Sequence, residues 1–204
     1  MQTLIETPKS SLNVYNINTI FENHDDDDDK NDNSIIEKCV EEVQDKLLKN
    51  PEVFVFGKRG VQHREIGFFS DESIGYPYSN QLARSQPLSP HLKKLLKLIN
   101  KKFKTKFNGI LVNKYVNGLD NIGEHSDDES QLDNAGVIAI SYGAVRKFRI
   151  RDKKTKKIVK DIPTLPNQII QMAGDFQKEF KHGIPVQKKI TEPRISFTFR
   201  KHIV

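Results

Sequence analysis

Hydrophobic residues recur at helical spacing in two stretches of the chain. The first stretch begins at Ser34, three residues before Glu37, which is the spacing of a capping box at a helix start. Its apolar face consists of Ile36, Val40, Val43, Leu47 and Leu48. The second stretch begins at Ser89, with Pro90 at its first position and lysines on its polar face. Its apolar face consists of Leu92, Leu95, Leu96, Ile99 and Phe103. We predict two helices that pack against the core and carry no catalytic or binding residues.

Most of the remaining sequence has the pattern of β-strands. Runs rich in β-branched and aromatic residues are separated by Gly, Pro, Asn or charged turns. These runs cover residues 53–56, 109–116, 136–142, 145–151, 168–172 and 194–200. Two helices followed by many strands predict an α+β protein built on a double-sheet β-sandwich, of which the jelly roll is one example.

Residues 1–33 show no sustained periodicity. They are rich in Asn, Ser and Asp, and residues 25–29 are five consecutive aspartates. Runs of like charge stay solvated and do not pack into a core. We therefore predict a disordered tail over residues 1–33 and a single folded domain over residues 34–204.

Net charge and cysteine content indicate which kind of partner and which cellular compartment suit this protein. The net charge is +6 over 204 residues despite the acidic run, which suits a polyanionic partner such as nucleic acid, although lysine-rich soluble proteins are also common. Cys39 is the single cysteine, so no internal disulfide can form, as in a reducing compartment. No apolar run approaches the roughly 20 residues that span a membrane, and no signal-peptide core is present. We expect an intracellular monomer without membrane association, nuclear if the source is eukaryotic.

His125 and Asp127 have the spacing of a pair of metal ligands. Residues two apart on an extended strand point to the same face, so this imidazole and carboxylate can converge on one ion. His182, which follows the apolar run at 169–172, is the natural third ligand. Two histidines and one carboxylate bind ferrous iron and leave positions for a bidentate co-substrate and oxygen. Zinc suits the same ligands, and a solvated acidic loop would also explain residues 125–129.

Residues 194–200 alternate strictly between polar and apolar side chains. Arg194, Ser196, Thr198 and Arg200 share one face of the expected strand, and Ile195, Phe197 and Phe199 share the other. Two arginines on a buried strand are costly unless they meet anions, and guanidinium groups bind carboxylates bidentately. A dicarboxylate such as 2-oxoglutarate offers two such anions, and Asn113 and Tyr115 offer further hydrogen bonds. The alternative is an edge strand with solvent-facing arginines.

These motifs, taken in order along the chain, resemble the AlkB family of iron- and 2-oxoglutarate-dependent dioxygenases, which remove alkyl lesions from nucleic-acid bases. The resemblance covers roughly residues 53–203, and the branch acting on double-stranded DNA looks most similar. The motifs are Asn113-x-Tyr115, Ile122-Gly-Glu-His125-x-Asp127-Asp-Glu129, Ser141-Tyr-Gly-Ala144, His182 and Arg194-x5-Arg200.

The resemblance implies a double-stranded β-helix, or jelly roll, flanked by helices. It assigns Fe(II) to His125, Asp127 and His182, with 2-oxoglutarate and O2 as co-substrates. The residues it assigns to 2-oxoglutarate are Asn113, Tyr115, Arg194, Thr198 and Arg200. Relatives commonly carry Asn at the position of Ser196, whose hydroxyl can still hydrogen-bond a carboxylate. We therefore expect Ser196 to belong to the co-substrate site, with weakened binding.

The resemblance also implies residues that contact a damaged base. Asp128, with Glu129 beside it, would accept a hydrogen bond from an exocyclic amine. Tyr76, Pro77 and Tyr78 match the segment whose aromatic ring stacks on the flipped base, with Tyr78 facing the base. As the alternative, these are ordinary strand residues.

A hydrophobic finger is expected at Phe56, Gly57 and Lys58. There the aromatic ring would fill the gap that an extruded base leaves in duplex DNA. Lys58, Arg59, Arg146 and residues 153–157 would then bind phosphates without reading sequence. The alternative is that Phe56 is a plain core residue.

The implied reaction is oxidative demethylation of bases of the N1-methyladenine and N3-methylcytosine type in DNA. Decarboxylation of 2-oxoglutarate accompanies hydroxylation of the N-methyl group and release of formaldehyde. The partner would be alkylated DNA. Single-stranded DNA, RNA or a protein side chain as substrate, and an inactive nucleic-acid-binding module, are the alternatives.

Overall fold

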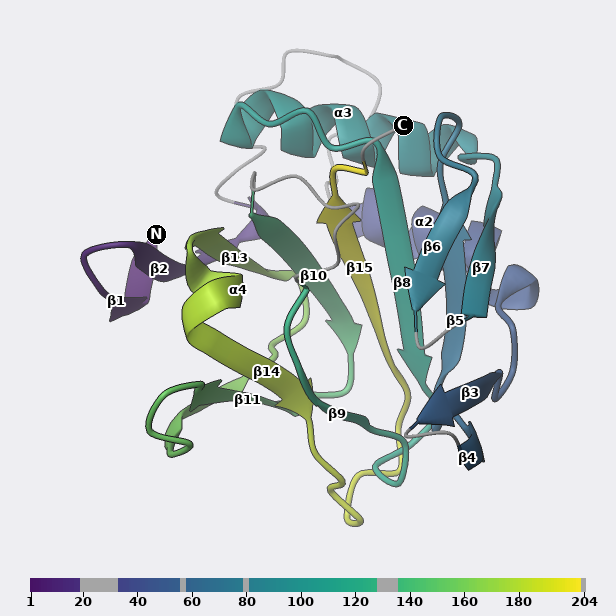
Figure 1. The fold of residues 1–204 in the computed structure, drawn as a ribbon. Helices are drawn as coiled ribbons and strands as arrows, with labels where there is room; N and C mark the ends of the chain where they lie inside the picture. Colours follow the sequence, from purple (N-terminus) through teal and green to yellow (C-terminus); the bar gives the residue numbers. More distant parts are fainter. Residues whose placement is uncertain (19–32, 56–57, 79–80, 128–135, 203–204) are drawn as a thin grey trace.

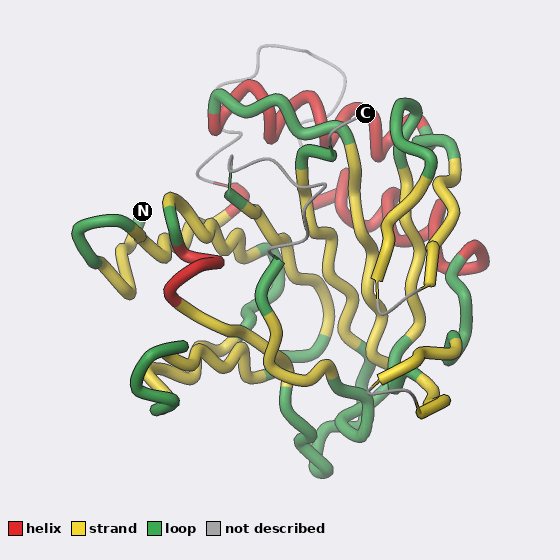
Figure 2. The backbone as a smooth tube through the Cα atoms, in the orientation of Figure 1, coloured by secondary structure: helices red, strands yellow, loops and turns green. Residues whose placement is uncertain are grey.

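The computed structural model describes residues 1–18, 33–55, 58–78, 81–127 and 136–202. Strands make up most of this part of the chain, as Figure 2 shows. Two sheets form the body of the protein, and two helices lie together over the larger one (Figure 1). None of the described helices is both long and apolar enough to cross a membrane.

The larger sheet has nine strands. Their order is β1 (Gln2–Glu6), β2 (Ser10–Asn16), β13 (Gln168–Gly174), β10 (Val137–Gly143), β15 (Arg194–Arg200), β8 (Gly109–Tyr115), β5 (Glu65–Phe69), β7 (Gln81–Gln86) and β6 (Gly75–Tyr78). The smaller sheet has the order β12 (Ile158–Pro163), β11 (Lys147–Asp152), β14 (Phe180–Ile184) and β9 (Ile122–His125). A separate hairpin joins β3 (Glu52–Val55) to β4 (Lys58–Val61).

The centre of the molecule is the predicted jelly roll. Strands β13, β10, β15 and β8 pair antiparallel in the larger sheet, and β12, β11, β14 and β9 pair antiparallel in the smaller one. Two stacks of four antiparallel strands are the architecture of a double-stranded β-helix. The fold class expected from the sequence is therefore confirmed.

Strand β15 divides its side chains between two environments, as its alternation predicted. Ile195, Phe197 and Phe199 pack into the hydrophobic core beneath the helices α2 (Asn33–Val43) and α3 (Pro90–Phe103). The four polar residues of the strand line a cavity on its opposite face. Period-two alternation thus gives one strand both a core face and a polar face.

The two predicted helices are present, with one boundary that differs. Helix α3 begins at Pro90 and ends at Phe103, as predicted. Helix α2 ends at Val43, because the chain continues as a 3-10 turn, η1 (Gln44–Lys46), before Leu48 bridges Ile66 in the larger sheet. The apolar periodicity up to Leu48 therefore extended the predicted helix too far.

The prediction of disorder over residues 1–33 is wrong for residues 2–16. These residues form the hairpin β1–β2, and β2 pairs with β13 from Ser10 to Asn16. Leu12 is completely buried, and burial alternates along β2 with period two. The alternate positions Ser11, Asn13 and Tyr15 are half-buried and carry polar groups, which concealed this strand. The acidic run lies in residues 19–32, outside the described part.

Candidate metal and co-substrate site

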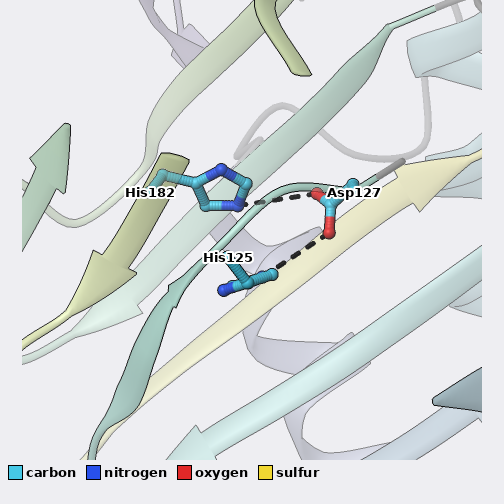
Figure 3. Close-up of side chains that lie close together, drawn as sticks. All are labelled: His125, Asp127 and His182. Carbon is cyan, nitrogen blue, oxygen red and sulfur yellow. Dashed lines mark ion pairs between the residues drawn. The ribbon is translucent and has the colours of Figure 1, made fainter. Parts of the chain in front are cut away.

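His125, Asp127 and His182 converge at the smaller sheet. Strands β9 and β14 pair so that His125 and His182 stand directly opposite each other, and Asp127 follows two residues after the end of β9. The Nε2 atoms of His125 and His182 each lie 3.5 Å from a different oxygen of the Asp127 carboxylate (Figure 3). Candidate ligand atoms of all three lie within 4.8 Å of one another. Two ligand bonds of about 2.0–2.2 Å to one ion span up to about 4.4 Å, which covers both 3.5 Å separations.

The surroundings hold Asp127 and His182 in the protonation states that bind metal. Burial alone would raise the pKa of Asp127, but the positive charge of Arg200 and the neighbouring histidines outweigh it and hold this pKa well below its usual range. Arg200 Nη2 donates a 2.7 Å hydrogen bond to Asp127 Oδ1. Burial, together with the charges of His125 and Arg200, lowers the pKa of His182 to about 3. A carboxylate and a neutral imidazole are the forms that ligate a cation.

Neighbouring groups fix the orientation of the ligands. Gly123 O lies 2.9 Å from His125 Nδ1, which leaves Nε2 directed toward Asp127. The Asp127 backbone N–H donates to Gln177 Oε1 at 2.9 Å, and Ser126 Oγ donates to Phe180 O at 2.9 Å. Hydrogen bonds from such neighbours fix the orientation of metal ligands.

Arg194 is a buried cation beside the same cavity. Its Nη2 donates to Ser141 Oγ at 2.8 Å and its Nε donates to Thr164 Oγ1 at 3.1 Å, while its guanidinium carbon lies 5.3 Å from the centre of the Tyr115 ring. Its Nη1 has no hydrogen-bond partner among the described residues. Burial lowers the pKa of Arg194 to about 10, so the side chain stays charged at neutral pH. A buried guanidinium with an unused donor suits a carboxylate ligand.

A cavity of about 530 Å³ connects these groups. Its wall includes the three residues of the His-Asp-His cluster and the polar face of β15. From β8 it includes Asn113, whose Oδ1 accepts a 2.8 Å hydrogen bond from Arg64 Nε, and Tyr115. Cavities of roughly 300–1,000 Å³ are typical of small-molecule sites.

Residues 17–200 match the 2OG-Fe(II) oxygenase superfamily. The chain belongs to this superfamily. Membership of this family implies Fe(II), with 2-oxoglutarate and O2 as co-substrates. A metal site explains why His125 and Asp127 are two residues apart, so the alternative of a solvated acidic loop is not needed. Asp127 has an unsatisfied oxygen beside two histidines, which fits a bound cation. Arg194 has an unused donor, which fits a bound anion.

The similar proteins place this oxygenase among the AlkB homologues. The human "DNA oxidative demethylase ALKBH2" is 32% identical over 81% of this chain and 66% of its own length. The mouse protein of the same name is 31% identical over 81% of this chain and 72% of its own length. The chain thus spans about two thirds of the length of these relatives. The structure titled "The structure of OsALKBH1" has a TM-score of 0.55 at 18% identity, covering 98% of this chain and 100% of its own, which shows the shared fold.

The predicted base-contacting residues of this oxygenase are only partly described. Tyr76 is buried and lines the cavity, with its ring 4.8 Å from the guanidinium carbon of Arg200. Pro77 and Tyr78 lie on β6, and their side chains are outside the described part. Asp128 and Glu129 fall outside the described residues.

The predicted finger is described in part. Phe56 and Gly57 lie outside the described residues, between β3 and β4. Lys58 is exposed at the start of β4, and Arg59 is exposed and pairs with Glu52 across the hairpin. Both cations remain accessible to a polyanion.

The predicted phosphate contact of Arg146 is wrong. Its side chain is almost completely buried, and its guanidinium donates to the backbone carbonyls of Asn117, Asp120 and Pro185 at 2.9, 2.8 and 3.0 Å. Its position just before β11 suggested a surface, but loops far apart in sequence close over it. Their carbonyl groups carry no signal that the local pattern could reveal.

Three further residues at the site had no predicted role. Gln177 holds the Asp127 backbone, while Ser141 and Thr164 hold Arg194. Ser141 lies within one of the family motifs, which was the available signal for it. Gln177 and Thr164 come from segments without a distinguishing pattern.

Proposed function

We propose that this chain oxidatively demethylates alkylated bases of the N1-methyladenine and N3-methylcytosine type in DNA. The observation that carries the proposal is that the His-Asp-His cluster and the buried Arg194 line one cavity. Two similar proteins with DNA oxidative demethylase in their names support the choice of substrate. A basic net charge of +6 suits a nucleic-acid partner.

In this proposal His125, Asp127 and His182 hold ferrous iron. The bound iron, with 2-oxoglutarate and O2, supplies the oxidation of the N-methyl group, after which formaldehyde leaves and the base is restored. Asp127 supplies negative charge, and Arg200 balances part of that charge through its hydrogen bond to Asp127 Oδ1, the oxygen that also faces His125 Nε2. Gln177 keeps the Asp127 backbone in place, so the carboxylate stays aimed at both imidazoles.

Arg194 would hold one carboxylate of 2-oxoglutarate. Ser141 and Thr164 hold two of its donors and leave Nη1 for the ligand. Because Arg194 is already buried, its charge needs little further desolvation when the dicarboxylate enters. The remaining polar residues proposed for this co-substrate are Asn113, Tyr115, Ser196, Thr198 and Arg200, all of which line the cavity.

Alkylated DNA reaches the cavity past the β3–β4 hairpin and β6. Phe56, Gly57 and Lys58 form the proposed finger that replaces an extruded base in the duplex stack. Tyr76, Pro77 and Tyr78 supply the proposed stacking surface, and Asp128 and Glu129 the proposed acceptors for the amine of the base. Phosphates contact exposed lysines such as Lys58, Lys154, Lys156 and Lys157 without reading sequence. Lys153, also expected to bind phosphate, is half-buried and donates to Gln177 O at 2.6 Å.

The direct test is mass spectrometry of an oligonucleotide with one N1-methyladenine, incubated with iron-loaded protein with and without 2-oxoglutarate. We expect loss of the methyl group only when 2-oxoglutarate is present. Asp127→Ala should abolish turnover and leave the fold intact by circular dichroism, whereas Asp45→Ala, at an exposed position of η1, should not change turnover. Retained turnover in Asp127→Ala would show that the metal site lies elsewhere.

The same assay on single-stranded DNA, duplex DNA and RNA decides the substrate. Turnover on RNA alone would contradict the DNA assignment and keep the dioxygenase assignment. If no alkylated oligonucleotide leads to succinate formation, the chain is a binding module or acts on another class of substrate.

A further inference from the structure

Gln62 is a buried side chain in the cavity wall that the proposed chemistry does not use. It lies between β4 and β5, is 5% exposed, and lines the cavity. Neither its amide nitrogen nor its carbonyl oxygen has a hydrogen-bond partner among the described residues. Leaving both polar atoms of a buried carboxamide unsatisfied costs free energy, so such a group in a folded protein usually has a ligand or an ordered water as its partner.

The backbone around Gln62 is fixed on both sides. The Gln62 N–H donates to Pro51 O at 2.9 Å, and the neighbouring His63 O accepts a 2.9 Å hydrogen bond from Asn121, just before β9. Arg64 Nε donates to Asn113 Oδ1 on β8. Figure 1 shows the β3–β4 hairpin beside β9 and the end of β8. Gln62 therefore stands at a fixed place in the wall, on the side of the hairpin.

The other unsatisfied polar atoms in the wall belong to charged or metal-binding groups. Among the described cavity residues they include Asp127 Oδ2, His182 Nδ1 and Arg194 Nη1. Iron and a dicarboxylate account for Asp127 Oδ2 and Arg194 Nη1 in the proposed function, whereas His182 Nδ1 is the ring nitrogen opposite the one that faces Asp127. Gln62 differs because a carboxamide is neutral and offers one donor and one acceptor side by side.

We propose that Gln62 is a specificity-determining residue that hydrogen-bonds the N6–N7 edge of an alkylated adenine. This inference rests on the proposed function. The adenine edge presents the N6 amine as donor and N7 as acceptor, and a carboxamide matches both at once. Methylation at N1 leaves both groups in place. On 3-methylcytosine the amine at C4 has a C–H group beside it, so Gln62 can form only one of the two hydrogen bonds.

The test uses iron-loaded full-length protein and three single-stranded oligonucleotides, carrying 1-methyladenine, 7-deaza-1-methyladenine or 3-methylcytosine. A bidentate contact of this kind gives about 5- to 150-fold discrimination. Gln62→Met, which keeps the shape and removes both polar atoms, should lower kcat/KM on 1-methyladenine by a factor in that range. It should change kcat/KM on 3-methylcytosine much less. Gln44→Met, the same change at an exposed position of η1, should alter neither.

The 7-deaza base separates recognition from structure. Replacing 1-methyladenine by its 7-deaza form should lower kcat/KM of the wild-type protein by part of the factor that Gln62→Met causes on 1-methyladenine. The same replacement should not lower kcat/KM of Gln62→Met any further, because the methionine makes no hydrogen bond to N7. The melting temperature of Gln62→Met should not fall, since two unsatisfied polar atoms are removed.

Three results would overturn the inference while wild-type protein remains active. One is an equal loss on all three bases together with a lower melting temperature, which means a structural role. Another is a raised KM for 2-oxoglutarate with unchanged base preference, which places Gln62 at the co-substrate. The third is unchanged kinetics in Gln62→Met. If wild-type protein converts none of the three oligonucleotides, the proposed function itself fails, and the two failures are therefore distinguishable.

Discussion

The guanidinium of Arg146 joins segments that carry the site residues. Its three carbonyl partners lie in the loop before β9, which leads to His125, and directly after β14, which carries His182. Its guanidinium carbon lies 5.6 Å from the centre of the Tyr115 ring, with Arg194 against the same ring at 5.3 Å. Thr164 Oγ1 accepts from both the Arg146 backbone N–H and Arg194 Nε. One buried cation thus holds the metal and co-substrate sides of the cavity together.

Arg146→Lys should therefore destabilise the protein by about 2–4 kcal/mol, because an ammonium group cannot reach three carbonyls placed around a planar guanidinium. Urea unfolding of the metal-free protein measures this loss. Arg149→Lys, three residues along the same strand, is the matched control. Arg149 pairs with Asp161 at the partly exposed surface of β11, where such a pair contributes at most about 1 kcal/mol. Equal losses in the two variants would remove the special role of Arg146.

At the scale of elements, the hairpin β1–β2 belongs to the larger sheet, whose strands β15 and β8 line the co-substrate side of the cavity. Thr7 Oγ1 donates to Glu179 Oε2 at 2.7 Å, and Ser10 Oγ donates to the same oxygen. Glu179 ends the short helix α4 (Phe176–Glu179), in which Gln177 holds Asp127. The hairpin therefore supports the element that positions the carboxylate of the metal cluster.

Leu12→Ala in β2 should cost about 2–5 kcal/mol of stability, because this side chain is completely buried and its removal leaves a cavity. Leu119→Ala, at a position that is 58% exposed, should stay within about 0.5 kcal/mol of wild type. Denaturant unfolding of both variants gives the comparison. A stability of Leu12→Ala close to wild type would mean that the hairpin does not contribute to the folded core.

Local patterns predicted the elements whose alternation or periodicity is strong. Strand β15 and helix α3 were predicted at their observed bounds, since each has one wholly apolar face and one polar face. The hairpin β1–β2 and the short strand β14 were not predicted as strands, because pairing with distant strands stabilises them more than their own composition does. Local sequence carries little information about such partners.

At the scale of the whole molecule, some features of the site were predicted from the sequence and others were not. The cluster of His125, Asp127 and His182 was predicted from spacing and from a family resemblance, and the fold brings the three together. The contact of Arg200 with Asp127 and the carbonyl contacts of Arg146 were not predicted. Both depend on segments that are tens of residues apart, and only the jelly-roll topology makes them neighbours.

This topology places the three metal-binding residues and Arg194 around one cavity. Binding of the metal ion, and then of 2-oxoglutarate, should therefore each stabilise the whole domain. Mn²⁺ serves as a redox-inert ion. When 2-oxoglutarate is present at about 100 times its Kd, its binding adds about 2.7 kcal/mol to the free energy of unfolding, which raises Tm by roughly 5–10 °C in a domain of this size. Arg194→Gln should keep the increment from Mn²⁺ and lose most of that from 2-oxoglutarate, whereas Asp127→Ala should lose both. Arg84→Gln, at an exposed position of β7, should behave as wild type. Differential scanning fluorimetry measures all four proteins, and a full 2-oxoglutarate increment in Arg194→Gln would contradict the assignment of this arginine to the co-substrate.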